Sequence, residues 1–140
     1  MNYREVEGGR EFVARLETGA DWRAEIEALA EDAGVDAGFF LALGAVSAAE
    51  FFFYDQERTE YDAIAFEEPL EVAACVGDVS ILDGERFAHT HAVCSRPDGS
   101  AVAGHLDSAT VFAGECYLRE FDARLEREHD STTDLDLWPL

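Results

Sequence analysis

The pattern with the clearest chemistry is a His-Thr-His run followed by a third histidine. His89 and His91 lie in a strand-like segment, where residues two positions apart project from one face, roughly 6.5 Å apart along the chain. His105 ends the next strand-like segment, across a turn at residues 97–99. In a hairpin, His91 and His105 would become approximate cross-strand neighbours. Three imidazoles with an open fourth position are typical of an accessible zinc site, so we expect His89, His91 and His105 to bind zinc or a similar divalent transition metal.

The histidine pattern also has a plainer explanation. A His-x-His run alone is a weak signal, because polar histidines also occur on the solvated face of a sheet. The third histidine, across a predicted hairpin, strengthens the metal interpretation without excluding the other. His129, the remaining histidine, lies outside this segment.

The elements that must position these side chains are mostly strands. Alternating or continuous apolar patterns predict strands at residues 11–16, 37–46, 50–54, 61–66, 70–76, 79–82, 87–94, 101–105 and 110–118. The nearly all-apolar run 37–46 is typical of a strand buried on both faces. Turn residues at 77–78, 83–84 and 97–99 separate strands, and 83–84 and 98–99 resemble hairpin tips.

One helix is predicted clearly. Thr18 with Asp21 resembles a capping box at its start, an apolar stripe of Trp22, Ile26, Leu29 and Ala30 follows at helical spacing, and Gly34 is a fitting end. The polar segment 122–130 is compatible with a short helix, and the apolar end 135–140 is expected to dock on the body or on a neighbour. The predicted class is α+β: one main helix packed on a mostly antiparallel sheet, in a single domain of residues 1–140.

Composition limits the environment of the protein. A chain of 140 residues that is 48% hydrophobic can bury a real core. No apolar run approaches the roughly 20 residues that a membrane helix needs, and residues 1–10 do not have the basic-then-apolar order of a signal peptide. We therefore expect a cytoplasmic protein without a membrane partner.

The charge is strongly acidic. The chain has 31 acidic residues and 10 basic ones, all of them Arg, which gives a net charge of −21. Salt shortens the screening length to roughly 3 Å near 1 M, so an acidic surface without Lys suggests a halophilic protein in a salt-rich cytosol. The alternative is mimicry of nucleic acid or binding of a basic partner. Direct binding to duplex DNA is disfavoured, because it depends on cations that displace counterions.

The three cysteines do not form a recognisable motif. Cys75, Cys94 and Cys116 are odd in number, never spaced as Cys-x-x-Cys, and placed in apolar strand-like segments. We expect reduced, buried thiols that pack as small apolar groups. Metal ligation and catalysis are the alternatives.

A series of short motifs runs along the chain in a fixed order. They are residues 68–72 (EPLEV), Gly77, 89–91 (HTH), 98–99 (DG), 103–106 (AGHL) and Glu115, preceded by 19–21 (GAD) and 43–46 (LGAV). Across residues 10–137 the chain thereby resembles the plants-and-prokaryotes conserved (PPC) domain, whose pattern is approximately GPFEI, G, HxH, DG, GGHL and E. It departs from the pattern at Glu68, Leu70 and Ala103, which replace Gly, Phe and Gly.

The resemblance implies a homotrimer with a histidine-lined metal pocket. The acetolactate decarboxylases, whose fold is related, also present a His-x-His…His zinc site, which makes catalysis conceivable by analogy of folds. The family is often labelled DNA-binding, but its plant members grip the minor groove with Arg-Gly-Arg AT-hooks, and no such segment occurs here. The label therefore transfers poorly.

Four charged residues are candidates for roles beside the metal. We expect Glu71 and Glu115 to be the nearest carboxylates, as a general base or, more simply, as groups that orient a histidine. Arg86 and Arg96 flank the histidine strand and could receive an anionic ligand, although solvated loop arginines would look the same.

Three functions remain open at this point. The first is a regulatory protein that binds metal and acts through assembly and partners, in association with DNA through them. The second is a zinc-dependent lyase or hydrolase acting on a small carboxylate or carbonyl compound. The third is a sensor of a metal or metabolite. For assembly, the aromatic run 51–54 and the apolar end 135–140 offer surfaces that a trimer could cover.

Overall fold

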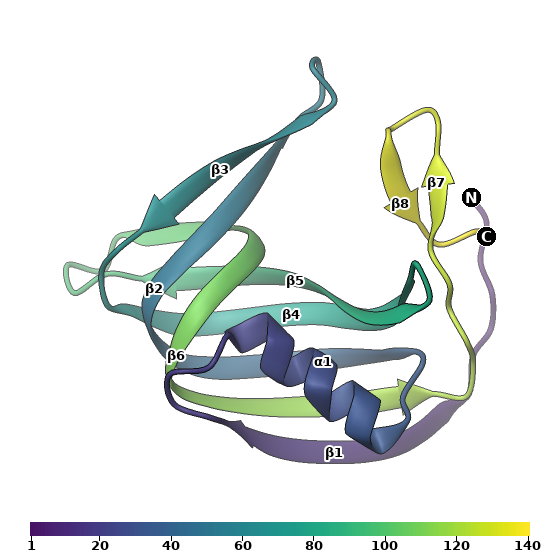
Figure 1. The fold of residues 1–140 in the computed structure, drawn as a ribbon, viewed down its shortest axis with the longest axis horizontal. Coiled ribbons are helices and arrows are strands. Elements are labelled where there is room, and N and C mark those ends of the chain that lie inside the picture. The colour runs from purple at the N-terminus through teal and green to yellow at the C-terminus, as the bar shows by residue number, and fades with distance from the viewer.

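Eight strands and one helix make up the fold in the computed structural model, which describes residues 1–140 (Figure 1). Their order is β1 (Gly8–Leu16), α1 (Trp22–Ala33), β2 (Gly38–Asp55), β3 (Glu60–Phe66), β4 (Leu70–Leu82), β5 (Glu85–Ser95), β6 (Ala101–Phe121), β7 (Glu128–Asp130) and β8 (Leu135–Leu137). The predicted α+β class, with one helix on a mostly antiparallel sheet, is confirmed.

Six strands form one antiparallel sheet that closes on itself. The order is β1-β6-β5-β4-β2-β3, and β6 pairs with β2 as well as with β5 and β1. Strands β2, β4, β5 and β6 are therefore hydrogen-bonded in a ring. The helix α1 lies along one side (Figure 1), and its fully buried residues Trp22, Ile26 and Ala30 join the core. None of the helical structure has the length and hydropathy that a membrane-spanning helix needs.

Several strands are longer than the sequence pattern predicts. β2, β4 and β6 run for 18, 13 and 21 residues, each joining two predicted strands. The expected break at residues 77–78 is wrong, because Gly77 lies inside β4, where a side chain would collide with the His89 carbonyl and the Phe40 ring. Glycine is placed here by close packing rather than by a turn. The tips at Asp83-Gly84 and Asp98-Gly99 are confirmed.

The helix begins at a different cap from the predicted one. Asp21 is the N-cap, and its Oδ1 accepts the amide of Ala24 at 2.9 Å, whereas the Thr18 hydroxyl donates to the Phe112 carbonyl. The Asp21 Oδ2 also accepts the amide of Ala109 in β6 at 3.0 Å, so one carboxylate caps the helix and ties it to the sheet. Gly34 ends the helix with a left-handed φ of 67°, as expected.

The C-terminal segment folds as a hairpin. Residues 122–130 contain no helix. Instead β7 and β8 pair around a turn in which the Asp130 carboxylate accepts the amides of Thr132 and Thr133 at 3.0 and 2.8 Å. The Tyr54 hydroxyl donates to the Thr133 carbonyl at 2.5 Å, which links the hairpin to the arm formed by β2 and β3 (Figure 1). The apolar end 135–140 itself stays largely exposed in the single chain, with Leu137, Trp138 and Leu140 at 40%, 37% and 42% exposure, so its expected docking stays a prediction.

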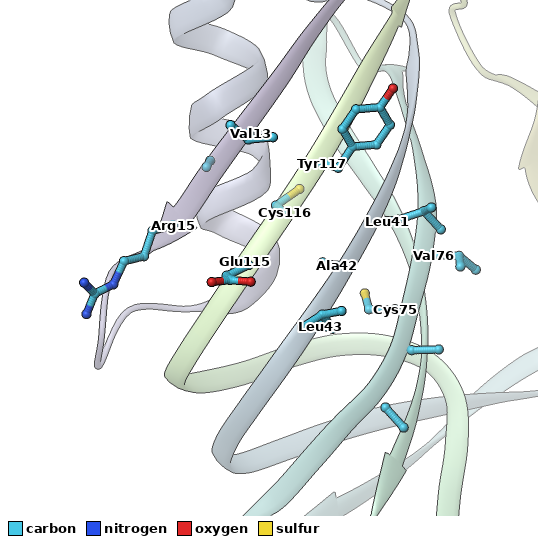
Figure 2. Close-up of a pocket in the computed structure, with 13 residues that line it drawn as sticks. Val13, Arg15, Leu41, Ala42, Leu43, Cys75, Val76, Glu115, Cys116 and Tyr117 are labelled. Carbon is cyan, nitrogen blue, oxygen red and sulfur yellow. The ribbon is translucent and has the colours of Figure 1, made fainter.

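One face of the sheet is apolar and open in the single chain. The expectation that 37–46 is buried on both faces is wrong here, because Phe40 and Ala42 are buried whereas Leu41 and Leu43 are 48% and 57% exposed. Val13, Tyr117, Leu41 and Val76 are successive cross-strand partners and so share this face. A depression of about 630 Å³ lies on this face across β1, β6, β2 and β4, and Figure 2 draws the residues that line it.

Candidate metal centre

The three predicted histidines converge in the structure. One ligand atom from each of His89, His91 and His105 lies within 4.8 Å of the other two. The ring centroids are 5.1, 5.2 and 5.4 Å apart. His91 and His105 are direct cross-strand partners in the β5–β6 hairpin, as the turn at 97–99 predicted. The close grouping of three nitrogen donors fits a single metal ion.

Strand alternation explains this convergence. Thr90, between the two histidines of β5, points inward and is fully buried, with its hydroxyl donating to the Ala88 carbonyl at 2.8 Å. Its neighbours His89 and His91 therefore point outward together. From β2, Phe52 lies opposite His105 and stacks on it, with centroids 6.1 Å apart and planes at 7°. Packing thus holds the third ring in place.

The surroundings of the cluster lower the pKa values of two of its histidines. Burial first, and then repulsion from the neighbouring His89 and His91, lowers the pKa of His105 to about 4. Burial likewise lowers the pKa of His91. Both rings are therefore neutral near pH 7, which is the protonation state in which imidazole binds a metal.

An ion pair that the sequence did not reveal adjoins the cluster. Asp78 lies directly across from His89, with its Oδ2 3.3 Å from His89 Nδ1. The Arg127 guanidinium, only 7% exposed, donates to both Asp78 oxygens at 2.9 and 3.1 Å. Burial raises the pKa of Asp78, but the contacts with His89 and Arg127 outweigh it, so the pKa is lowered. Asp78 therefore stands as a carboxylate behind the cluster.

A pocket of about 300 Å³ opens beside the histidines. The sheet contributes His89, His105 and Phe87, and the arm contributes Phe52 and Tyr61. The helix adds Arg23, and the C-terminal segment supplies a further wall: Arg127, Asp134, Leu135, Asp136 and Leu137. The aromatic and apolar walls with a few charged groups are the usual lining of a small-molecule site.

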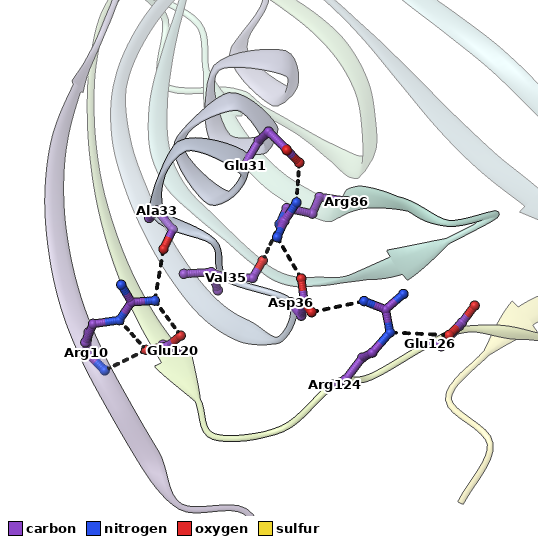
Figure 3. A network of polar contacts seen from close by, with 9 residues as sticks. All are labelled: Arg10, Glu31, Ala33, Val35, Asp36, Arg86, Glu120, Arg124 and Glu126. Carbon is purple, nitrogen blue, oxygen red and sulfur yellow. Dashed lines mark hydrogen bonds and ion pairs between the residues drawn. The ribbon is translucent and has the colours of Figure 1, made fainter.

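The other sequence candidates lie elsewhere. Glu71 and Glu115 are exposed and do not line this pocket, so their expected place next to the histidines is wrong for the single chain. Glu115 lies instead on the open apolar face (Figure 2). Arg86 is held by Glu31, Asp36 and the Val35 carbonyl (Figure 3), and Arg96 pairs with Glu68 at 2.7 Å. Neither arginine faces the cluster.

The cysteines are free and buried, as expected. Burial raises the pKa of Cys75 to about 12 and those of Cys94 and Cys116 to about 11. The thiols therefore stay protonated near pH 7, which disfavours both nucleophilic and ligand roles.

Two features could have pointed to the missed residues. Asp78 pairs with His89 once residues 70–82 are accepted as one strand. Arg127 is the only arginine between Glu126 and the chain end, in a segment rich in acids. Neither feature carries a recognisable motif.

Solved structures resemble the chain over nearly its whole length. A metal-containing protein from Archaeoglobus fulgidus is 39% identical, with a TM-score of 0.94 and 99% of both chains covered. A plant- and prokaryote-conserved (PPC) protein from Pyrococcus horikoshii is 26% identical, with a TM-score of 0.93 over 100% of this chain and 98% of that one. A candidate DNA-binding protein from Ralstonia eutropha is also 26% identical, with a TM-score of 0.82 over 91% and 90%.

A weaker likeness concerns the fold alone. A Staphylococcus aureus protein of unknown function similar to α-acetolactate decarboxylase is 11% identical, with a TM-score of 0.57 over 86% of this chain and 55% of that one. No curated protein matches the chain. The model of the Plants and Prokaryotes Conserved (PCC) domain, the name also abbreviated PPC, matches residues 3–122. With its fold and its motif order, the chain therefore belongs to the PCC domain family.

Proposed function

We propose that this chain binds one divalent transition metal, zinc or a similar ion, through His89, His91 and His105. The observation that carries the proposal is the convergence of three ligand atoms within 4.8 Å. Three neutral imidazoles suit zinc and its neighbours better than Mg²⁺ or Ca²⁺, which prefer oxygen ligands. The name of the Archaeoglobus relative as a metal-containing protein supports the same conclusion.

The metal site is proposed to work within a homotrimer. The open apolar face extends to the site, because Val76 pairs with Leu41 on one side and with His91 on the other. A second copy that covers this face would therefore approach His91, the most exposed of the three ligands. Glu115 lies on the same open face, so in this arrangement the Glu115 carboxylate of the second copy would approach the ion bound by the first.

The coordination position left by three ligands is proposed to receive a small carboxylate or carbonyl ligand. The pocket beside the histidines has room for one, and its Arg23 lies over the Phe87 ring at 5.7 Å and pairs with Asp107 at 3.3 Å. In a sensor or regulatory protein, ligand binding would change the assembly or its contacts with partners. DNA association, suggested by the name of the Ralstonia relative, would then be indirect, because the net charge of −21 opposes contact with phosphates.

A metal-dependent enzyme is the second candidate. The observation in its favour is that the open position would face an aromatic and charged pocket rather than bulk solvent. Turnover of a panel of small keto and hydroxy acids by metal-loaded protein, absent from metal-free protein, would identify a lyase or hydrolase. Binding without turnover would identify a sensor.

The metal proposal is tested by elemental analysis and competition with a chelator. We expect one ion per chain. Loss of a residue that only hydrogen-bonds to a ligand typically weakens metal binding roughly 10–100-fold, so His105→Ala, which removes a proposed ligand, should weaken it more. The control is His129→Ala, since His129 is 59% exposed in β7 and lies apart from the cluster. Equal affinity in wild type and His105→Ala would overturn the proposal.

The DNA prediction is tested separately. Fluorescence anisotropy with duplex DNA at physiological salt should show no tight, sequence-specific binding. Specific nanomolar affinity of the purified protein would refute the indirect role.

A further inference from the structure

One ring nitrogen of His89 lies between a hydrogen-bond donor and a hydrogen-bond acceptor. Its Nδ1 is 3.3 Å from Asp78 Oδ2 and 3.3 Å from Arg127 Nη2. A carboxylate can only accept a hydrogen bond, and a guanidinium can only donate one. The two neighbours therefore favour opposite tautomers of the same ring.

Only one of these tautomers can bind a metal through Nε2. When Nδ1 carries the proton and donates it to Asp78, the Nε2 lone pair is free. When Nδ1 instead accepts from Arg127, the proton is on Nε2 and blocks that nitrogen. Asp78 thus selects the ligating form of His89, as second-layer carboxylates do at other metal sites, and Arg127 selects the blocked form.

The charges of Asp78 and Arg127 change metal affinity in the same directions as the His89 tautomers that the two residues favour. The Asp78 carboxylate attracts a cation at the cluster, and the adjacent guanidinium repels it. Both side chains are largely buried, 14% and 7% exposed, so solvent screens these effects only weakly. For each residue, therefore, orientation and charge predict the same sign of change in metal affinity.

Arg127 is also what joins the C-terminal segment to the site. Its Nε donates to Ser80 at 2.8 Å and its Nη1 to the Asp136 carbonyl of β8 at 2.9 Å. Its guanidinium lies over the rings of Phe87 and Trp138. This segment lies beyond the family match, which ends at residue 122.

We propose that Asp78 is a positioning residue that strengthens metal binding through His89, and that Arg127, carried by residues 123–140, weakens it. The proposal rests on the three-histidine metal site. Docking of the C-terminal segment would then tune the affinity of the site downward, and by reciprocity metal binding would loosen the β7–β8 hairpin. Asp78 keeps a partner without Arg127, since Ser80 Oγ donates to it at 3.1 Å.

The test measures Zn²⁺ affinity by competition with a chelator. Asp78→Ala should weaken binding about 10–100-fold, and Asp78→Asn, which keeps an acceptor without the charge, should lie between it and wild type. Arg127→Gln should strengthen binding about tenfold, whereas Arg127→Lys, which keeps the charge, should stay near wild type. The two variants must change Zn²⁺ affinity in opposite directions, because a loss of structure would weaken binding in both Asp78→Ala and Arg127→Gln.

Two controls match these changes away from the site. Glu85→Ala removes one exposed negative charge from β5, and Arg10→Gln removes an arginine that lies outside residues 123–140 and pairs with Glu120 at 2.8 Å (Figure 3). Both should bind Zn²⁺ as wild type does. Weaker binding in Arg127→Gln, or unchanged binding in Asp78→Ala, would overturn the proposal.

A second readout does not depend on the metal. The ring nitrogen shifts of His89 in metal-free protein, measured by NMR, report the tautomer directly. Asp78→Ala should move the ring toward the Nε2–H form and Arg127→Gln toward the Nδ1–H form. If the two variants show these tautomer changes but the wild-type protein binds no Zn²⁺, the proposed metal function is refuted and the tautomer selection is upheld. If the variants show no tautomer change, the selection itself is overturned.

Discussion

Lowering the pH should destabilise the metal-free protein through His105. Its pKa in the folded state is about 4 because of burial first and the adjacent histidines second, against an ordinary 6.5 in the unfolded chain. Between these values the unfolded state binds more protons, so stability is complete above pH 6.5 and falls as the pH drops toward 4. From these two pKa values we expect a loss of about 2 kcal/mol between about pH 7 and pH 5.

The assay is urea unfolding of chelator-treated protein over this pH range, in salt high enough to screen the acidic surface. The comparison is His105→Gln, which removes the titrating ring and leaves the carboxylates that titrate in the same range. The variant should lose about 2 kcal/mol less than wild type between the two pH values. An identical pH dependence in both proteins would refute the assignment of a depressed pKa to His105.

Three further predictions follow from packing and burial. Leu41→Asp should give a monomer, by light scattering, in salt where wild type is trimeric, since it charges the apolar face; a wild-type monomer at high salt and concentration would refute the trimer. The buried thiols, represented by Cys75, should react with a thiol reagent only after unfolding; rapid native reaction would contradict their burial. Gly77→Ala should lower stability by about 1–3 kcal/mol in urea unfolding, because the added methyl meets Phe40 and the His89 carbonyl; Gly99→Ser, at an open hairpin tip, is a comparison without a packing clash, although its left-handed φ adds backbone strain.

The convergence of the three histidines could be predicted from the sequence because a hairpin is a local structure. Strand alternation placed His89 and His91 together, and the turn at 97–99 set His105 across from His91. The spacing of two and a short turn are visible in the chain itself. For the same reason the helix and its glycine end could be identified.

The groups behind the ligands could not be found in this way. Asp78 was hidden because Gly77 resembles a turn residue, whereas the structure uses it for close packing. Arg127 reaches the site from 38 residues beyond His89, over a segment without a distinctive pattern. Glu115 matched the family motif in order, but order along the chain does not determine distance in the fold.

The long strand β6 also has a consequence for the order of folding. Its first residues complete the histidine cluster by pairing with β5 across a short turn, whereas its last residues pair with β1, as in Gly8 with Phe121. Closing the short loop costs far less chain entropy than joining the two ends of the protein. The β5–β6 hairpin can therefore form before the ring closes, and a metal ion that meets this hairpin could act as a template for the rest of the chain.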